Sequence, residues 1–230
     1  MTGMTAPDWP LFGLRLRCRD ASLRCVRDAD LPHLATILPD DYELHPRAEL
    51  LSGLDTQQNR RRLLCQDYWR ALGTWSPSAW CLNFAVEYGG DIVGVQALEA
   101  NDFPAVRTVD SGSWLIPEVR GRGVGVAMRM AVLGLAFDYL DARAAITSAR
   151  TDNGPSLGVS RRIGYIDNGV SLNSASDGTI ELIHLRLTAD AWRASGLGGE
   201  VTVEGFDPCL PWFGITAKEQ GLKAQGAAPD

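Results

Sequence analysis

Three glycines and two arginines gather in residues 120–125, where the sequence reads Arg-Gly-Arg-Gly-Val-Gly. An apolar run typical of a strand precedes this stretch, and the spacing of apolar residues over 124–140 predicts a helix after it. The first N–H groups of a helix have no backbone partners, so a glycine loop that enters a helix turns them towards a bound group. Phosphate oxygens are natural acceptors for such N–H groups. The stretch therefore predicts an anion cradle.

Spacing separates the phosphate-binding loops to which these glycines could belong. The chain has no Gly-Lys-Ser or Gly-Lys-Thr, which excludes the P-loop. The dinucleotide fingerprint requires a glycine at its sixth position, and counting from Gly121 this position is Val126. The pattern that remains is Arg-x-x-Gly-x-Gly, with Arg120, Gly123 and Gly125 as its members.

A second motif lies in residues 153–165, after a strand-like run over residues 144–149. It consists of Asn153, a small residue, a helical segment and a final Gly-Tyr. Together with the Arg-x-x-Gly-x-Gly loop, this order and spacing resemble the GNAT N-acyltransferase superfamily, which binds acyl-coenzyme A. Residues 112–120 and 28–34 are similar to its RimJ/RimL-type branch, whose members acylate protein N-termini or small amines. Within that branch the likeness is to actinobacterial members, some of which transfer succinyl groups.

The resemblance extends over roughly residues 14–187. It implies an α/β (α+β) fold with a mixed, mostly antiparallel sheet flanked by helices, and with acyl-coenzyme A entering between splayed central strands. We expect an N-terminal extension over residues 1–13, an acyltransferase domain over 14–195 and a C-terminal extension over 196–230. The aromatic part of that extension is too apolar for a free linker and is expected to pack on the domain or a partner subunit. Disorder is expected over residues 217–230.

The resemblance also implies which groups hold coenzyme A. The pantetheine arm would pair with a strand formed by Trp114, Leu115 and Ile116. The pyrophosphate would be bound by the charges of Arg120 and Arg122 and by the backbone amides of Arg122, Gly123, Val124, Gly125 and Val126. Asn153 would contact the pantetheine or the water chain of the attacking amine, and Ser156 lies on the same helix.

Members of the superfamily transfer the acyl group by direct attack of the amine on the thioester, so the catalytic candidates are proton carriers. Many relatives place a tyrosine where this chain has Ser160, and we expect Ser156 to assist the leaving thiolate instead, with Asn153 beside it. Carboxylates around the strand that precedes the loop are the candidates for the general base. They are Asp110 first, then Asp102, Glu99 and Glu181.

The composition excludes other function classes. A net charge of −6 and an isoelectric point near 5.1 argue against nucleic acid or membrane as a partner, because both require a basic face. Five cysteines without Cys-x-x-Cys, and no signal-peptide pattern, predict a reduced, cytoplasmic protein. The three histidines lack metal-ligand spacing, so no metal is expected. The expected partners are a coenzyme A thioester, an amine acceptor (a protein or a small molecule) and, through the apolar tail, a second copy in a homo-oligomer.

Three alternatives remain open. Residues 154–158 also satisfy the Gly-x-Ser-x-Gly pattern of a serine hydrolase, with Ser156 as nucleophile and His184 as the downstream histidine. A non-catalytic module of the same fold could bind acyl-coenzyme A without turnover or hold a partner through the aromatic tail. The donor could be acetyl- or succinyl-coenzyme A. A succinyl carboxylate requires an arginine or amide partner near Trp114, and Arg107 or an arginine of the first helical region could supply it.

Other patterns predict the elements around the site. A helix is expected over residues 48–72, and Gly-Gly-Asp at residues 89–91 predicts a hairpin. One strand is expected near residues 108–116 and a last strand over 180–187, followed by a helix capped by Thr188.

Overall fold

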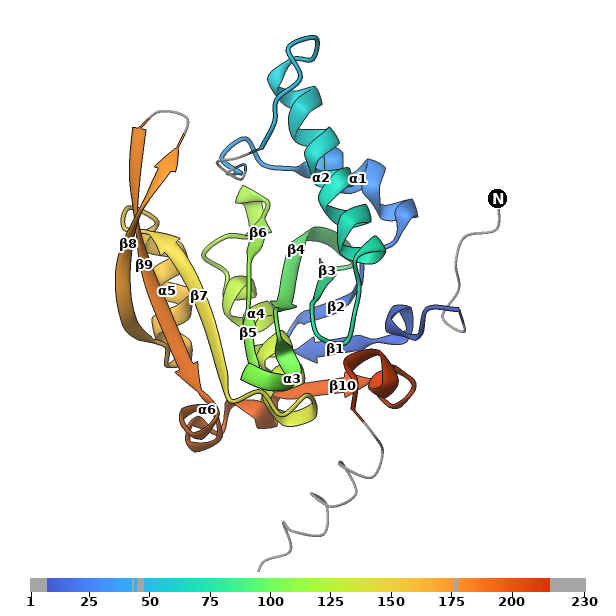
Figure 1. The fold of residues 1–230 in the computed structure, drawn as a ribbon, viewed down its shortest axis with the longest axis vertical. Coiled ribbons are helices and arrows are strands. Elements are labelled where there is room, and N and C mark those ends of the chain that lie inside the picture. Colours follow the sequence, from blue (N-terminus) through green and yellow to red (C-terminus); the bar gives the residue numbers. More distant parts are fainter. Residues whose placement is uncertain (1–7, 43, 45–47, 176–177, 216–230) are drawn as a thin grey trace, which may run out of the picture.

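The computed structural model describes residues 8–42, 44, 48–175 and 178–215. Its strands are β1 (Arg15–Cys18), β2 (Ala21–Cys25), β3 (Trp80–Tyr88), β4 (Asp91–Ala100), β5 (Thr108–Asp110), β6 (Ser113–Leu115), β7 (Ala144–Arg150), β8 (Ile166–Ala175), β9 (Gly178–Thr188) and β10 (Val201–Glu204). They form one sheet in the order β10-β1-β2-β3-β4-β5-β7-β9-β8, with β6 paired to β4 (Figure 1). All pairs are antiparallel except β5 with β7. The mixed, mostly antiparallel sheet flanked by helices confirms the predicted fold class.

Helices cover both faces of this sheet. They are α1 (Leu31–Ile37), α2 (Thr56–Gly73), α3 (Phe103–Val106), α4 (Val124–Gly134), α5 (Gly154–Ile163) and α6 (Ala189–Ser195). Neighbouring strand residues point to opposite faces, and on β3 Phe84 packs in the cluster that contains α4, whereas Ala85 packs in the cluster that contains α1 and α2. The sheet therefore separates two helical layers. Within the described ranges, no helix has the length and apolar character needed to cross a bilayer.

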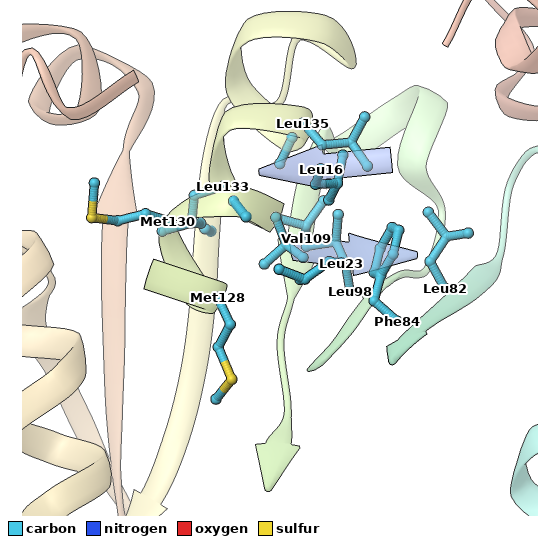
Figure 2. Packing of buried hydrophobic residues seen from close by; sticks show 14 of the residues in the cluster. Leu16, Leu23, Leu82, Phe84, Leu98, Val109, Met128, Met130, Leu133 and Leu135 are labelled. Carbon is cyan, nitrogen blue, oxygen red and sulfur yellow. The ribbon is translucent and has the colours of Figure 1, made fainter. Parts of the chain in front are cut away.

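Helix α4 is the central helix of the larger core. Every residue from Val126 to Gly134 is buried, and Figure 2 shows Leu133 and Leu135 among the strand residues Leu16 and Val109. Residues Leu135–Tyr139 continue the helix as a π-helical turn. The predicted helical segment over residues 124–140 is thus formed, and its N-terminus is anchored by a buried helix body.

Helix α2 starts later than the sequence predicts. The Asp55 carboxylate accepts a hydrogen bond from the Gln58 N–H at 2.7 Å, and the Gln58 side-chain oxygen accepts one from the Asp55 N–H at 2.9 Å. This reciprocal capping box sets the helix start at Thr56. The prediction of a helix from residue 48 was therefore wrong for its first part.

The C-terminal segment adds to the same sheet. Strand β10, which was not predicted, pairs with β1 in the register Leu16↔Val203. A 3-10 helical segment, Asp207–Phe213, follows, and the Phe213 ring lies 5.6 Å from Trp75 and 5.2 Å from Trp80 between ring centroids. The apolar tail thus packs on its own domain. Residues 217–230 lie outside the described residues.

Candidate functional site

The glycine loop leads directly into the N-terminus of α4. Gly121 and Gly123 have φ angles of 75° and 86°, a left-handed backbone that favours glycine. Helix α4 has no side-chain N-cap, and the Val126 N–H donates to the Gly123 carbonyl at 3.1 Å. The N–H groups of Val124 and Gly125 come earlier and have no intrahelical acceptor. Of the predicted phosphate-binding amides, Val126 therefore has a backbone partner, whereas Val124 and Gly125 are oriented for an external one.

Gly125 has a packing role. A Cβ at this position would lie 3.3 Å from Cγ2 of Val159 on α5, so the two helices approach closely beside the loop. Its φ is outside the left-handed region, unlike that of Gly123. The loop and the second motif are therefore in direct contact through Gly125 and Val159.

The two loop arginines have different environments. The Arg120 guanidinium donates to the Leu115 carbonyl at 2.9 Å and to the Asp41 carboxylate at 2.8 Å. The hydrogen bond from Arg120 lowers the pKa of Asp41. Arg122 is exposed. Arg120 thus ties the loop to the end of β6, and the phosphate contacts of both arginines stay predictions.

The strand expected near residues 108–116 is interrupted. Strand β5 pairs with β7 as far as Asp110↔Ile146. Strand β6 pairs instead with β4, from Ser113↔Gln96 to Leu115↔Gly94. Strands β6 and β7 diverge beyond this point (Figure 1). The two strands are therefore not hydrogen-bonded to each other, and we call the place where they diverge the splay.

The hydrogen-bond alternation of β6 determines which peptide groups face the splay. The Gly112 carbonyl accepts from the Ala97 N–H at 2.7 Å, and the Ile116 N–H donates to the Val93 carbonyl at 2.9 Å. Trp114, midway between them, must also direct its peptide groups to β4. The N–H groups of Ser113 and Leu115 therefore point away from β4 and towards the splay, where a bound chain or an oxyanion can accept them.

A cavity of about 520 Å³ lies on the α1/α2 side of β6. Trp114 is buried, lines this cavity and packs edge-on against Tyr42 with ring centroids 6.3 Å apart. It is both a core residue and a wall of the cavity. Ser113 also lines the cavity, so the cavity and the splay meet at this residue. The polar residues that line the cavity include Asp67, Arg70, Cys81, Asn83 and Glu99.

Two carboxylates share one side of the sheet beside this cavity. Glu99 and Asp110 are register partners on β4 and β5, which places their side chains on the same face. Burial raises the pKa of both groups, and the charge of Asp110 raises the Glu99 pKa further. Asp110 accepts a hydrogen bond from the Ser111 N–H at 2.6 Å. Of this pair, Glu99 lines the cavity.

The other two acidic candidates lie elsewhere. Asp102 is exposed, with a φ of 50°, before the short helix α3. Glu181 is exposed on β9, opposite Leu172 of β8. Neither is among the residues that line the cavity. The structure thus brings together Glu99 and Asp110 and leaves Asp102 and Glu181 outside.

The second motif forms the N-terminus of α5. The Asn153 side-chain oxygen accepts a hydrogen bond from the Ser156 N–H at 3.1 Å and caps the helix. Ser160, at the position of the expected tyrosine, is buried and donates to the Ser156 carbonyl at 3.2 Å. Ser160 therefore serves its own helix, whereas contacts of Asn153 and Ser156 with a ligand stay predictions.

The hydrolase alternative gains no support from the geometry. The His184 Nε2 lies 2.8 Å from the hydroxyl of Ser171, so its hydrogen-bond partner is not Ser156. A nucleophile must be within hydrogen-bond reach of its base, directly or through one water.

Within the part of the chain that the structure describes, no group of three or more His, Cys, Asp or Glu side chains is placed to hold a metal ion.

One buried charge was missed by the sequence analysis. Arg129 lies on α4, is 3% exposed and points to the splay, where its Nη1 is 3.4 Å from the Thr147 hydroxyl and its Nη2 is 3.4 Å from the Ser113 hydroxyl. The available signal was a charged residue within an otherwise apolar helical segment.

Comparison with known proteins adds the family. Residues 21–166 match the model of the acetyltransferase (GNAT) domain, which is more than half of the chain. The chain belongs to the GNAT acetyltransferase domain family. In this GNAT domain the glycine loop, the splay and the α5 motif all fall inside the matched residues, and membership supports an acyltransferase activity.

Solved structures share the GNAT fold. Mycobacterium smegmatis RimJ, in complex with coenzyme A disulfide, is 23% identical with a TM-score of 0.63, over 84% of this chain and 97% of that chain. RimL, a ribosomal L7/L12 alpha-N-protein acetyltransferase in complex with coenzyme A, is 17% identical with a TM-score of 0.59, over 75% and 96%. A chimeric spermidine N-acetyltransferase from Vibrio cholerae SpeG and hSSAT is 13% identical with a TM-score of 0.57, over 76% and 98%. At these identities the likeness establishes the fold.

Proposed function

We propose that the protein transfers an acyl group from a coenzyme A thioester to an amine. The observation that carries this proposal is the junction of the splay with the cavity at Ser113, next to the uncapped N-terminus of α4. The Val124 and Gly125 N–H groups would bind the phosphates of coenzyme A, and the pantetheine chain would run along β6. The thioester would then lie near Ser113, where it meets an acceptor bound in the cavity. Family membership supports coenzyme A as the carrier.

The proposed chemistry needs no protein nucleophile. The amine nitrogen attacks the thioester carbon, a C–N bond forms, and the C–S bond breaks through a tetrahedral intermediate. An N–H group of β6 that faces the splay, from Ser113 or Leu115, would stabilise the oxyanion. Glu99 would accept the proton that the amine loses, directly or through water, with Asp110 adjusting its basicity. The coenzyme A thiolate leaves and takes a proton from solvent or from Ser156.

The acceptor is proposed to be a cationic amine before it loses its proton. The cavity has an apolar wall that includes Leu34 and Trp114, and its acidic side chain Glu99 favours an ammonium group, whereas Asp67 is ion-paired with Arg70 at 2.7 Å. This environment and the residue pattern of the RimJ/RimL-like branch support a protein N-terminus, a lysine or a small amine as acceptor. All five cysteines are free thiols, which supports a reducing, cytoplasmic location.

Paired glycine variants test the donor site. Gly123→Glu places a carboxylate at the cradle, at a φ of 86°, and Gly90→Glu places the same charge in the β3–β4 hairpin at a φ of 95°. A Cβ meets no atom within 4 Å at either position, so the two changes impose similar local strain. Calorimetric titration with free coenzyme A should show binding to the wild type and to Gly90→Glu, and none to Gly123→Glu.

Turnover tests the chemistry separately. Thiol release from acetyl- and succinyl-coenzyme A should require an added amine from a panel of N-terminal peptides, lysine and polyamines. Coenzyme A binding without amine-dependent thiol release would favour a non-catalytic module. Equal affinity of the wild type, Gly90→Glu and Gly123→Glu for free coenzyme A would contradict the site assignment, and so would no binding to the wild type.

A further inference from the structure

The guanidinium of Arg129 is buried without a close counter-ion. The residue is 3% exposed, and its guanidinium donates long hydrogen bonds, 3.4 Å each, to the hydroxyls of Ser113 and Thr147. Among the described residues, no carboxylate lies within the 4 Å of an ion pair with it. Asp110 acts on it electrostatically from a greater distance. A buried charge with such weak hydrogen bonds is costly unless a further partner is present.

Other polar atoms around Arg129 are also unsatisfied. The Arg129 Nε, the Ser111 hydroxyl, the Tyr165 hydroxyl and the Gln96 side-chain oxygen are all buried and have no hydrogen-bond partner. Burial raises the pKa of Tyr165, whereas the neighbouring Arg129 and Ser111 side chains lower it, so these three groups lie together. Gln96 is the register partner of Ser113. Because buried polar side chains normally have partners, this group indicates a site that a polar ligand or ordered water completes.

The position of this group is the vertex of the splay. Arg129 reaches Ser113 on β6 with one nitrogen and Thr147 on β7 with the other, so it bridges the two strands where they part. Ser113 is exposed and also lines the acceptor cavity. A chain that enters between β6 and β7 therefore ends next to this guanidinium.

We propose that Arg129 binds a carboxylate at the far end of the donor's acyl group, so that the enzyme prefers a dicarboxylic acyl thioester, of which succinyl-coenzyme A is the test case. A planar guanidinium with an unsatisfied Nε can bind a carboxylate through two hydrogen bonds. The hydroxyls of Ser111 and Tyr165 supply further donors. The inference rests on the proposed acyltransferase function and specifies its donor.

Of the sequence candidates for this cation, Arg107 and Arg60 are engaged elsewhere, and Arg70 lines the cavity in an ion pair with Asp67. Arg107 donates to the Leu140 carbonyl at 3.0 Å, and its guanidinium lies over the Phe103 ring, 5.6 Å from the centroid. In the α2 region Arg60 donates to the carbonyls of Asp40 and Tyr42, the latter at 2.9 Å. Arg129 is the arginine that the fold places at the vertex.

Calorimetric titration with free, butyryl- and succinyl-coenzyme A tests the proposal. The butyryl and succinyl groups both have four carbons, and only the succinyl group carries a carboxylate. We expect the wild type to bind succinyl-coenzyme A about tenfold or more tightly than butyryl-coenzyme A, which corresponds to a hydrogen-bonded charge. Arg129→Met should abolish this difference and leave the affinity for free coenzyme A unchanged. Arg107→Met is the matched control and should keep the wild-type ratio.

Several outcomes would overturn the proposal. Equal wild-type affinities for the two acyl thioesters would mean that water completes the site, and this measurement needs no variant. A uniform loss across all three ligands in Arg129→Met would assign the residue a structural role. If Arg129→Met does not fold, Thr147→Val should still reduce the succinyl preference, and an unchanged ratio would count against the site. No binding of free coenzyme A to the wild type would instead refute the acyltransferase proposal itself.

Discussion

Glu99 and Asp110 lie directly opposite each other on β4 and β5; Glu99 lines the acceptor cavity and is exposed, whereas Asp110 is half-buried. Burial raises the pKa of both carboxyls, and the Asp110 charge raises the Glu99 pKa further. The same pairing that makes Glu99 a stronger base also means that its ionised form destabilises the folded protein. Activity and stability should therefore respond in opposite directions when this carboxyl is neutralised.

We expect Glu99→Gln to lower kcat by about a hundredfold, because a positioned general base contributes on the order of 10²–10⁴ to the rate. In the wild type the rate should rise with pH through the raised pKa of Glu99. Asp110→Asn removes the neighbouring negative charge and should shift this rise to lower pH. The measurement is the pH profile of kcat/KM for the three proteins. An unshifted profile in Asp110→Asn would show that the two carboxyls do not communicate.

The stability of Glu99→Gln should increase at neutral pH. The folded-state pKa of Glu99 is raised, so its contribution to stability is fully present below the unfolded-state pKa and is lost as pH rises through the folded-state pKa. A glutamine, which does not ionise, avoids that loss. Thermal unfolding of the two proteins should show a higher Tm for the variant at pH 7 and no gain at pH 4. A lower Tm at both pH values would contradict the pKa direction.

Close packing at Gly125 should couple the glycine loop to the second motif. Gly125→Val adds a side chain whose Cβ alone would be 3.3 Å from Val159 Cγ2, and we expect a loss of about 1–3 kcal/mol of unfolding free energy from overpacking. Val159→Ala removes the opposing methyl groups and should recover part of that loss in the double variant. Urea unfolding of all four proteins gives the coupling energy. Strictly additive single effects would show that the two side chains do not compete for space.

Asp41 should compete with phosphate for Arg120. The pair is partly exposed, with side-chain exposures of 39% for Arg120 and 63% for Asp41, so its removal should change stability by less than about 1 kcal/mol. Asp41→Asn releases the guanidinium, and we expect a several-fold higher affinity for coenzyme A that fades at high salt. Titrations at two salt concentrations check this. A weaker affinity would mean that Asp41 holds Arg120 in its binding position.

Local patterns predicted the parts of the site that depend on nearby residues. The glycine loop, the helix after it, the Asn153 cap and the hairpin at Gly89-Gly90 each follow from turn, capping or periodicity rules, and all are present. The β10 strand was missed because its pairing partner, β1, is distant in the sequence. The β8 strand was also missed, and its partner β9 is the next strand along the chain. The start of α2 was misplaced although the Asp55/Gln58 capping box is a local signal that could have located it.

The division of the predicted 108–116 strand could not be foreseen, because it depends on partners far apart in the sequence. Strand β5 pairs with β7, whereas β6 pairs with β4. The close approach of β6 to β4 requires a glycine at position 94, because a Cβ there would lie 2.2 Å from the Trp114 carbonyl oxygen. The same long-range pairing decides that Glu99, rather than Asp102, faces the cavity. It also places Arg129 at the vertex, which no spacing within α4 could indicate.

The pairing of β1 with β10 also has a consequence for how the protein is made. During synthesis β1 is made before β10, so its outer edge has no partner until Val201–Glu204 leave the ribosome. Until then an open strand edge and the Trp75 and Trp80 rings, later covered by Phe213, remain available to other chains. Completion of the sheet, and with it protection from aggregation, therefore has to wait for β10, the last strand that the structure describes.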